Sequence, residues 1–338
     1  IKHKTKIMDK YLIFRTDRIG DFIFSRMLIQ SIKEKKPKSQ IDFVCSEYNS
    51  KYIKNFKDIN NIYILDKYDL PLMLNNLIKI NKLNYDNLII LDGKRRSIFF
   101  SFILNTSRKI AIVKDFLPKL ILRLFFKKYF INSELNSQFY NFSSFINYLD
   151  LKVPKKINYY QNYKFEKNNL IKNEKNFLLL HLDEKWFKGH YYDDFKYMDL
   201  KINNFYHLIK SIHKNLKKKI VITSGGYKIK DLELIIKKFF YKKEDNLYYS
   251  KKFGRNLIFI DNTSFRLLEL IVKKSSLVIC CEGAISHVSN AFDIKTIALI
   301  NTPGIKTALF WTKHMKNIKL LSRSNIKDIS SKLSCIKL

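Results

Sequence analysis

A short polar loop follows the first apolar run of the chain and carries residues suited to proton transfer. It reads Arg15-Thr-Asp-Arg-Ile-Gly-Asp21 and lies between the apolar run Tyr11–Phe14 and a segment of helical spacing. A carboxylate at Asp21, at the start of a helix and the carboxyl end of a strand, is placed to accept a proton from a substrate hydroxyl. The same carboxylate would also complement the positive end of the helix dipole. The spacing alone leaves both roles open.

Loops in the second half of the chain offer cations and backbone amides to an anion. The loop His181–Phe187 carries Lys185, either a cation for a leaving diphosphate or one solvated lysine among many. The segment Cys281–His287 opens a helix whose free amides and dipole favour a diphosphate. His287 in this segment is either a ligand contact or a structural histidine.

Two further turns could contact a nucleotide. Thr223-Ser-Gly-Gly-Tyr227 follows an apolar run, and its glycines would admit a phosphate or ribose closely or simply make a tight turn. Thr263 and Ser264 precede a helical segment, where a hydroxyl either bonds a nucleoside or caps the helix. The histidines are scattered, and no D-x-D motif stands in a strand-end loop, so we expect neither a metal nor another cofactor.

The elements that must position these loops alternate between apolar runs and segments of helical period. Strands are expected over 11–14, 41–45, 62–65, 88–91 and 109–113, and again over 177–182, 220–223, 257–260, 277–281 and 296–300. Helices are expected over Asp21–Lys35 and Phe265–Lys274 and along an apolar stripe from Phe205 to Leu216. This alternation predicts an α/β class with parallel sheets covered on both faces.

The segment Lys152–Asn176 interrupts the rhythm. It is rich in Lys, Asn and Tyr, contains Pro154 and has no sustained period. The length of 338 residues suffices for two domains. We therefore expect two Rossmann-like domains facing a central cleft: residues 1–155, a linker over 156–175, and residues 176–338.

The composition is that of a folded, strongly basic chain. Lys and Arg number 64 against 30 Asp and Glu, a formal charge of +34, and 46% of residues are hydrophobic. Such a chain can bury enough apolar surface to fold, which excludes wholesale disorder. The charge favours a polyanionic partner such as nucleic acid, anionic lipid or a phosphorylated sugar. Lys far outnumbers Arg, as codon use in an A+T-rich genome would also produce.

Cysteine use and the absence of targeting segments point to the cytoplasm. Cys45, Cys280, Cys281 and Cys335 form no C-x-x-C pair, so we expect free thiols in a reducing compartment. The basic N-terminus has no apolar segment behind it, and no run is long enough to span a bilayer. A location on the cytoplasmic face of the inner membrane is compatible with this pattern.

Two stretches of the first half resemble the opening and the next N-domain landmark of the family nine glycosyltransferases, which include the ADP-heptose:lipopolysaccharide heptosyltransferases. The first runs from Tyr11 through the Arg15–Asp21 loop and, after a helix, into Lys36-Pro-Lys-Ser-Gln-Ile-Asp-Phe-Val-Cys45. The second is Tyr85-Asp-Asn-Leu-Ile-Ile-Leu-Asp92, followed by Arg95-Arg96-Ser97. The resemblance continues into the second half and covers most of the chain.

The resemblance implies a GT-B fold and inverting, metal-independent sugar transfer. It implies that Asp21 is the catalytic base and that Arg18, Arg95 and Arg96 lie on the acceptor side. The expected donor-binding residues are Lys185, Thr263, Ser264, Glu282, Gly283 and His287. The donor it favours is ADP-heptose, and the acceptor is an anionic lipid-linked glycan of the lipopolysaccharide core type. The segment Glu282-Gly283-Ala284 departs from the family pattern of Asp, Ser or Thr, and Gly, and His181 stands near positions that usually carry hydroxyls.

Three alternatives remain open. The altered Glu282-Gly-Ala segment would suit a GT-B protein that has lost catalysis and binds anionic glycan or lipid. The stretch Arg95–Lys128 is apolar and basic together, as in a buried helix edged with lysines or in a surface that sits on anionic lipid. A nucleic-acid partner is supported by charge alone, because the sequence has no helix-turn-helix, zinc or RNA-binding motif, and we expect none.

Overall fold

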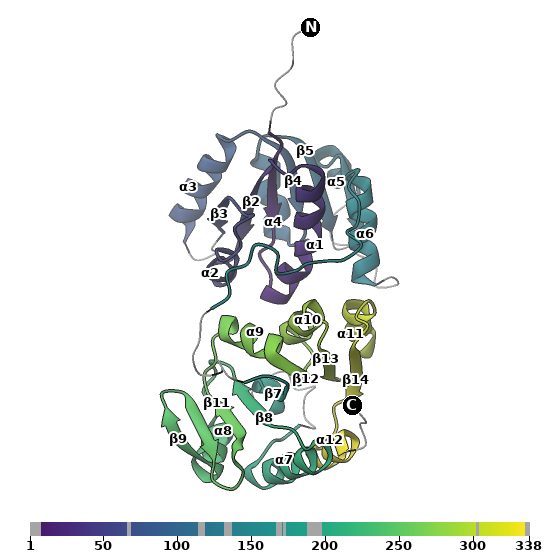
Figure 1. Ribbon diagram of the computed structural model, residues 1–338. Coiled ribbons are helices and arrows are strands. Elements are labelled where there is room, and N and C mark those ends of the chain that lie inside the picture. Colours follow the sequence, from purple (N-terminus) through teal and green to yellow (C-terminus); the bar gives the residue numbers. More distant parts are fainter. Residues whose placement is uncertain are drawn as a thin grey trace. The chain divides into compact units, whose positions relative to one another are not determined.

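The computed structural model describes residues 8–65, 69–113, 119–131, 137–166, 171, 174–187, 198–301 and 304–334. They form two compact α/β units, Ile1–Lys164 and Phe165–Leu338 (Figure 1). The boundary falls inside the segment 156–175 that the composition marks as a linker. Cys335 and the basic N-terminal residues 1–6 lie outside the described residues, whereas Cys45, Cys280 and Cys281 are buried free thiols.

The first unit contains a six-stranded sheet whose strands are all parallel, in the order β3-β2-β1-β4-β5-β6. Its strands are β1 (Lys10–Phe14), β2 (Gln40–Cys45), β3 (Asn61–Ile64), β4 (Tyr85–Ile90), β5 (Thr106–Val113) and β6 (Lys128–Ile131). The central strands are nearly continuous buried apolar runs, as expected for a sheet covered on both faces. The strand order reverses between β1 and β4, which makes their carboxyl ends the switch point where ligands bind in such sheets.

Six helices flank this sheet: α1 (Ile19–Lys35), α2 (Glu47–Ile53), α3 (Leu70–Asn81), α4 (Arg95–Ile103), α5 (Lys119–Phe125) and α6 (Gln138–Tyr148). Helices α1, α2 and α6 share one face, where Phe22 packs edge-on against Tyr52 and Phe24 against Phe142. Helices α3, α4 and α5 cover the other face and contribute to one buried cluster with the sheet.

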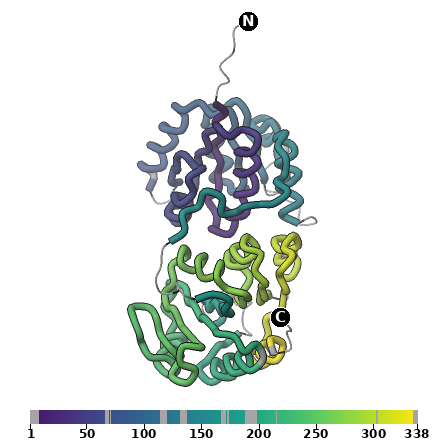
Figure 2. Tube along the Cα trace, viewed as in Figure 1, coloured from purple at the N-terminus to yellow at the C-terminus, as the bar shows by residue number. Residues whose placement is uncertain are grey.

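A return segment, residues 154–164, runs from the end of α6 across α1 (Figure 2). Arg26 of α1 donates to the backbone carbonyl oxygens of Tyr159 and Gln161 and forms a two-bond ion pair with Asp58, at 2.8 and 2.6 Å. Arg26 and Asp58 are both buried. The first part of the expected linker is therefore a packed part of the first unit.

The second unit contains an eight-stranded sheet in the order β14-β13-β12-β7-β8-β11-β10-β9. Its strands are β7 (Phe177–Leu182), β8 (Ile220–Ser224), β9 (Phe240–Glu244), β10 (Leu247–Ser250), β11 (Gly254–Ile260), β12 (Ser275–Cys281), β13 (Lys295–Ile300) and β14 (Ile318–Ser322). The strands are parallel except for β10, which pairs antiparallel with both β9 and β11. The order reverses between β7 and β12, so the second switch point lies at their carboxyl ends.

The described residues of the second unit contain the helices η1 (Glu184–Trp186), α7 (Ile202–Leu216), α8 (Lys230–Phe239), α9 (Phe265–Lys274), α10 (Ala284–Ala291), α11 (Ile305–Thr312) and α12 (Ile326–Ser334). Helices α7, α8 and α12 pack on one face, and α9 and α10 on the opposite face (Figure 1). The α/β class with two Rossmann-like units is confirmed. In the described parts of the chain, no helix is both long and apolar enough to cross a membrane.

Candidate functional site

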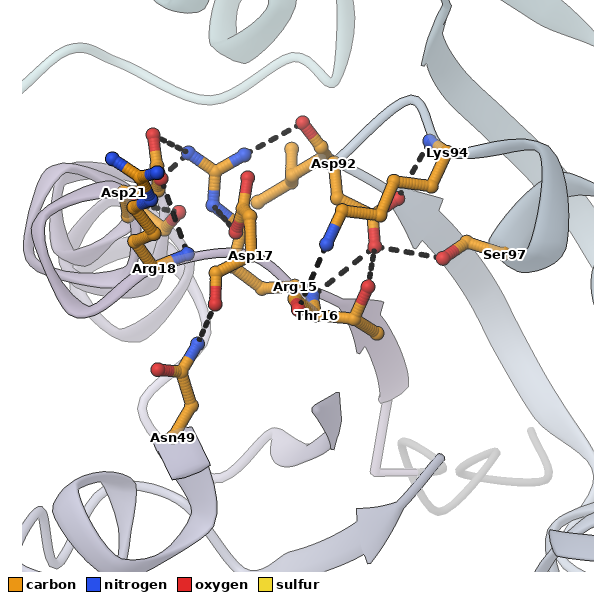
Figure 3. A network of polar contacts seen from close by, with 11 residues as sticks. Arg15, Thr16, Asp17, Arg18, Asp21, Asn49, Asp92, Lys94 and Ser97 are labelled. Carbon is orange, nitrogen blue, oxygen red and sulfur yellow. Dashed lines mark hydrogen bonds and ion pairs between the residues drawn. The ribbon is translucent and has the colours of Figure 1, made fainter. Parts of the chain in front are cut away.

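The switch point of the first unit is organised around Arg15, the first residue after β1. Its buried guanidinium donates to the carbonyl oxygens of Leu91 at 2.6 Å and Asp21 at 3.0 Å. The same group lies 3.2 Å from a carboxylate oxygen of Asp17 and 3.6 Å from one of Asp21, and 5.9 Å from the centre of the Phe142 ring. Arg15 thus joins the ends of β1 and β4 to the start of α1 (Figure 3).

Asp92, two residues after the end of β4, joins the loop after β1 to the loop after β4. One carboxylate oxygen accepts hydrogen bonds from the Thr16 amide at 3.1 Å, the Thr16 hydroxyl at 2.6 Å and the Ser97 hydroxyl at 2.7 Å. The Lys94 ammonium donates to the Thr16 carbonyl at 3.0 Å. These bonds hold the loop that carries Asp17 and Asp21 in one position (Figure 3).

Asp21 lies at the third position of α1 and caps the helix start. Its carboxylate accepts from the Arg18 backbone amide at 3.2 Å, and Arg18 is the N-cap residue. The helix-start role that the spacing allows is therefore present in the structure. The side chain keeps 19% of its surface exposed, which leaves the carboxylate accessible to a substrate.

Asp17 is a second carboxylate in this loop, and the sequence interpretation missed it. Burial raises its pKa to about 7 from an ordinary value of 3.8, Arg15 opposes that shift, and the carboxylates of Asp21 and Asp92 add to it. Its side chain is 20% exposed. The Asn49 side chain donates a hydrogen bond to the Asp17 carbonyl oxygen at 2.6 Å, which fixes the backbone of Asp17. The sequence feature that could have revealed Asp17 is a second acidic residue four places before Asp21.

The three arginines expected on the acceptor side begin helices at this same edge of the sheet. Arg18 and Arg95 are exposed and Arg96 is half-buried. Arg18 precedes α1 after β1, and Arg95 and Arg96 open α4 after β4, so all three belong to the two loops that Asp92 joins. Their role toward an acceptor stays a prediction.

The switch point of the second unit is organised around Lys185, which follows β7 in the short helix η1. The Lys185 ammonium donates to the Glu282 carbonyl oxygen at 2.5 Å and lies 3.9 Å from a carboxylate oxygen of Asp183. Trp186 is buried in the core, and its indole donates to the His181 carbonyl at 3.0 Å. Because this anchor fixes the loop, Lys185 is 92% covered rather than solvated like an ordinary surface lysine.

Both acidic and basic side chains lie close to Lys185. Burial opposes its ammonium, but Asp183 and Glu282 outweigh that cost and the pKa of Lys185 is raised. Arg323, which follows β14, lies with its guanidinium 3.9 Å from the Glu282 carboxylate and donates to the Leu299 carbonyl. Arg323 is buried and was not predicted, because β14 itself was not expected. Two cations thus flank the start of α10.

Helix α10 begins at this edge with its amides toward the strand ends. Gly283 is its N-cap residue with φ at +157°, and a Cβ there would lie 3.4 Å from the Lys185 ammonium nitrogen. His287, in the second turn, is half-buried, with its ring edge-on to Trp311 at 6.0 Å between centres. The structure therefore brings Lys185, Glu282 and Gly283 together and places His287 one turn further along.

Thr263 and Ser264 have structural roles in the loop after β11. The buried Thr263 hydroxyl donates to the Ile260 carbonyl at 3.0 Å. The Ser264 hydroxyl accepts from the Leu267 amide at 3.2 Å and caps α9. The cap interpretation is confirmed for Ser264, and nucleoside contact by either hydroxyl stays a prediction.

The double-glycine turn after β8 packs on this same loop. The Ser224 hydroxyl donates to the Asp261 carboxylate at 2.5 Å and accepts from the Asn262 amide at 2.9 Å. A Cβ at Gly226 would lie 3.3 Å from the Asn262 side-chain oxygen, whereas one at Gly225 would meet nothing within 4 Å. A side chain at position 226 would therefore press on Asn262, whereas position 225 faces open space.

His181 is a buried histidine with a structural partner. Its ring nitrogen Nδ1 lies 2.9 Å from the Thr223 hydroxyl, and burial lowers its pKa to about 4. It is therefore neutral near pH 7 and joins β7 to β8. Among the described residues, no group of three or more His, Cys, Asp or Glu side chains is arranged to hold a metal ion.

Comparisons with known proteins give the class of this fold. No family model and no curated protein matches the sequence. The solved structure of E. coli heptosyltransferase WaaC with ADP matches with a TM-score of 0.67 at 13% identity, over 96% of this chain and 98% of that one. A glycosyl transferase family 9 protein from Veillonella parvula DSM 2008 matches with a TM-score of 0.67 at 14% identity, over 97% and 94%.

More distant matches share the architecture with a different activity. The UDP-GlcNAc 2-epimerase from Methanocaldococcus jannaschii matches with a TM-score of 0.56 at 14% identity, over 97% of this chain and 92% of that one. The chain therefore has the GT-B fold, in its heptosyltransferase-like form. Because epimerases share the fold, the reaction must be argued from the residues at the two switch points.

Proposed function

We propose that this chain is an inverting, metal-independent glycosyltransferase that transfers a sugar from a nucleotide diphosphate to a lipopolysaccharide core or related bacterial surface glycan. The observation that carries the proposal is the covered Lys185 ammonium at the start of α10, at the switch point of the second unit. A fixed cation beside free helix amides is suited to a departing diphosphate. The heptosyltransferase-like fold favours ADP-heptose as donor.

In this proposal the second unit holds the donor. Lys185, with the amides of Gly283 and the residues after it, stabilises the negative charge that grows on the diphosphate as the sugar leaves. Glu282, Thr263, Ser264 and His287 are the proposed contacts to the rest of the nucleotide sugar.

The first unit supplies the base and the acceptor side. Asp21 takes the proton of the acceptor hydroxyl as the oxygen attacks the anomeric carbon and the bond to the diphosphate breaks. Arg15 keeps the Asp21 carboxylate in place. Arg18, Arg95 and Arg96 contact an anionic, lipid-linked acceptor, and the protein works at the cytoplasmic face of the inner membrane without nucleic acid or cofactor.

Asp21→Asn tests the base assignment. Asparagine can still accept the Arg18 amide, so the helix start is preserved, while the group that takes the proton is removed. We expect transfer from ADP-heptose to a lipopolysaccharide core acceptor to fall by about a hundredfold or more. Affinity for ADP is expected to stay within about threefold, since donor binding does not use this carboxylate.

The matched control is Asp231→Asn, which removes an acidic residue from the first turn of α8. It should lose neither transfer nor ADP affinity. If Asp21→Asn transfers sugar at the wild-type rate, Asp21 is not the base.

A GT-B protein that binds anionic glycan or lipid without catalysis is the second candidate. The observation that favours it is the Glu282–Arg323 contact at 3.9 Å, because a side chain directed at Arg323 is drawn away from a sugar. Binding of ADP without transfer to any lipopolysaccharide core acceptor would favour this candidate over the first.

A further inference from the structure

Three helices of the first unit lie together on one face of its sheet. Met73 and Leu77 of α3, Ile98 of α4 and Leu122 of α5 belong to one buried cluster beneath them. These helices cover the face of the sheet opposite the one that carries α1 and α6, and their outward side points away from the sheet.

These helices are joined into one continuous surface. The Asn81 side chain, at the end of α3, donates to the Ile103 carbonyl of α4 at 3.2 Å and accepts from the Asn105 amide at 2.7 Å. The rings of Phe102 and Phe125 stack with centres 4.1 Å apart and join α4 to α5.

This surface carries half of the exposed large hydrophobic side chains in the described residues. Leu120 and Leu124 are 70% and 73% exposed, Phe99 is 66% exposed, and Ile78 is 57% exposed. The others are Leu72, Leu74, Ile103 and Phe125. An exposed apolar patch of this kind on a folded protein marks an interaction site. We call these eight side chains the apolar face.

The charged residues within the three helices of the apolar face have a single sign, and one acidic residue, the exposed Asp69, lies beside them as the N-cap residue of α3. The sequences of α3, α4 and α5 contain no Asp or Glu. Their described side chains include the cations Lys79, Arg95, Arg96 and Arg123, and Lys127 and Lys128 follow α5. Apolar side chains among an excess of cations match a bilayer with anionic headgroups above acyl chains. A second copy would place like charges against one another, which disfavours self-association through this face.

We propose that the apolar face docks on an anionic lipid bilayer, with the leucine and phenylalanine side chains entering the headgroup boundary and the cations bound to lipid phosphates. The use of this docking to reach a lipid-linked acceptor rests on the proposed function. The lipid binding itself is measured without donor or acceptor, so its failure leaves the transferase proposal standing.

Vesicle co-sedimentation of the full chain tests the docking. The probes are phosphatidylcholine vesicles with and without phosphatidylglycerol. The double variant Phe99→Ser/Leu124→Ser keeps every charge, so it separates apolar insertion from attraction by the net charge of +34. Both side chains are exposed, so the variant should fold normally.

We expect wild type to bind the phosphatidylglycerol vesicles, and the double variant to bind them at least about tenfold more weakly. The matched control is Ile305→Ser/Leu309→Ser, which removes two apolar side chains that are each 44% exposed on α11. It should bind like wild type.

Three results would overturn the proposal. The first is equal binding by wild type and the face variant, which would assign the attraction to charge alone. The second is an equal loss in the α11 control. The third is a concentration-dependent dimer that the Phe99→Ser/Leu124→Ser change abolishes, which would assign the face to a second copy.

Discussion

At the scale of single residues, one guanidinium serves two carboxylates. Arg15 lies within 3.2 Å of Asp17 and within 3.6 Å of Asp21, and none of the three is fully solvated. A single buried cation cannot neutralise both anions equally, so protonation of one relieves repulsion on the other. Asp17 is the carboxyl of this group whose pKa is raised, and burial is the largest cause of that shift.

The raised pKa of Asp17 predicts a pH-dependent cost to stability. The folded-state pKa of about 7 exceeds the ordinary 3.8, so the folded chain keeps a proton that the unfolded chain loses between these values. Below about pH 4 the Asp17 carboxyl is protonated in both states and costs the folded chain nothing. As the pH rises toward 7, the unfolded chain ionises this group before the folded chain does, so the free energy of unfolding falls. Asp17→Asn removes the cost.

Urea unfolding at a series of pH values measures this effect. The unfolding free energy of Asp17→Asn relative to wild type should rise by on the order of 4 kcal/mol between pH 4 and pH 8. A difference that is flat with pH, or that falls, would mean that Asp17 is ionised in the folded protein throughout.

The sequence pointed to Asp21 and Lys185 because each lies in a loop that follows an apolar run, where parallel strands end, and because the family resemblance covers both loops. It did not indicate Asp17 or Arg323, because the properties of both come from tertiary neighbours. Burial in the folded unit raises the pKa of Asp17, and the carboxylate of Asp92, 75 residues away, adds to that shift. Arg323 is recognisable only once β14 places it beside Glu282.

At the scale of elements, apolar runs predicted the central strands of both sheets and the edge strand β3, and missed four strands at or next to the other edges. All ten expected strands occur, mostly extended by one to three residues. Strands β6, β9, β10 and β14 were not expected. In β9 four of five residues are exposed, so an edge strand of this kind has no buried apolar run to reveal it.

The packing of the return segment 154–164, which includes the first part of the expected linker, is likewise not visible in the local sequence pattern. Its composition is polar and has no period, yet Arg26 and Asp58 form a buried ion pair beside it and Arg26 bonds its carbonyl oxygens. Partners that lie this far apart in the chain are not visible as a local pattern.

Asp58→Ala should therefore destabilise the first unit strongly. It leaves the Arg26 guanidinium buried without its carboxylate, a change that costs about 3–5 kcal/mol. Chemical denaturation of the full chain measures the loss in the transition of this unit.

The exposed ion pair between Asp9 and Lys36 supplies the control, because its side chains are 34% and 36% exposed. Asp9→Ala should cost no more than about 1 kcal/mol. Equal losses in the two variants would show that burial of the Arg26–Asp58 pair does not determine its contribution.

At the scale of the whole molecule, two sheets each present one switch point, and each switch point holds a fixed cation. Arg15 is buried at the first and Lys185 at the second, both at the carboxyl ends of central strands. The excess of lysine is spread over the sequence, but these two cations are held by specific partners. Because Arg15 and Lys185 are buried, a basic composition alone does not account for their positions.

Titration calorimetry with ADP, without added metal, tests the central claim that the second unit binds a nucleotide diphosphate at Lys185. Wild type should bind ADP, and Lys185→Met should bind it at least about tenfold more weakly, the equivalent of one lost charged hydrogen bond. Lys219→Met is the control, because it removes a lysine that precedes β8 at the opposite edge of the sheet and pairs with Glu174. It should bind ADP like wild type. Undiminished ADP affinity in Lys185→Met, or no binding of ADP, GDP, UDP, CMP or dTDP by wild type, would contradict the claim.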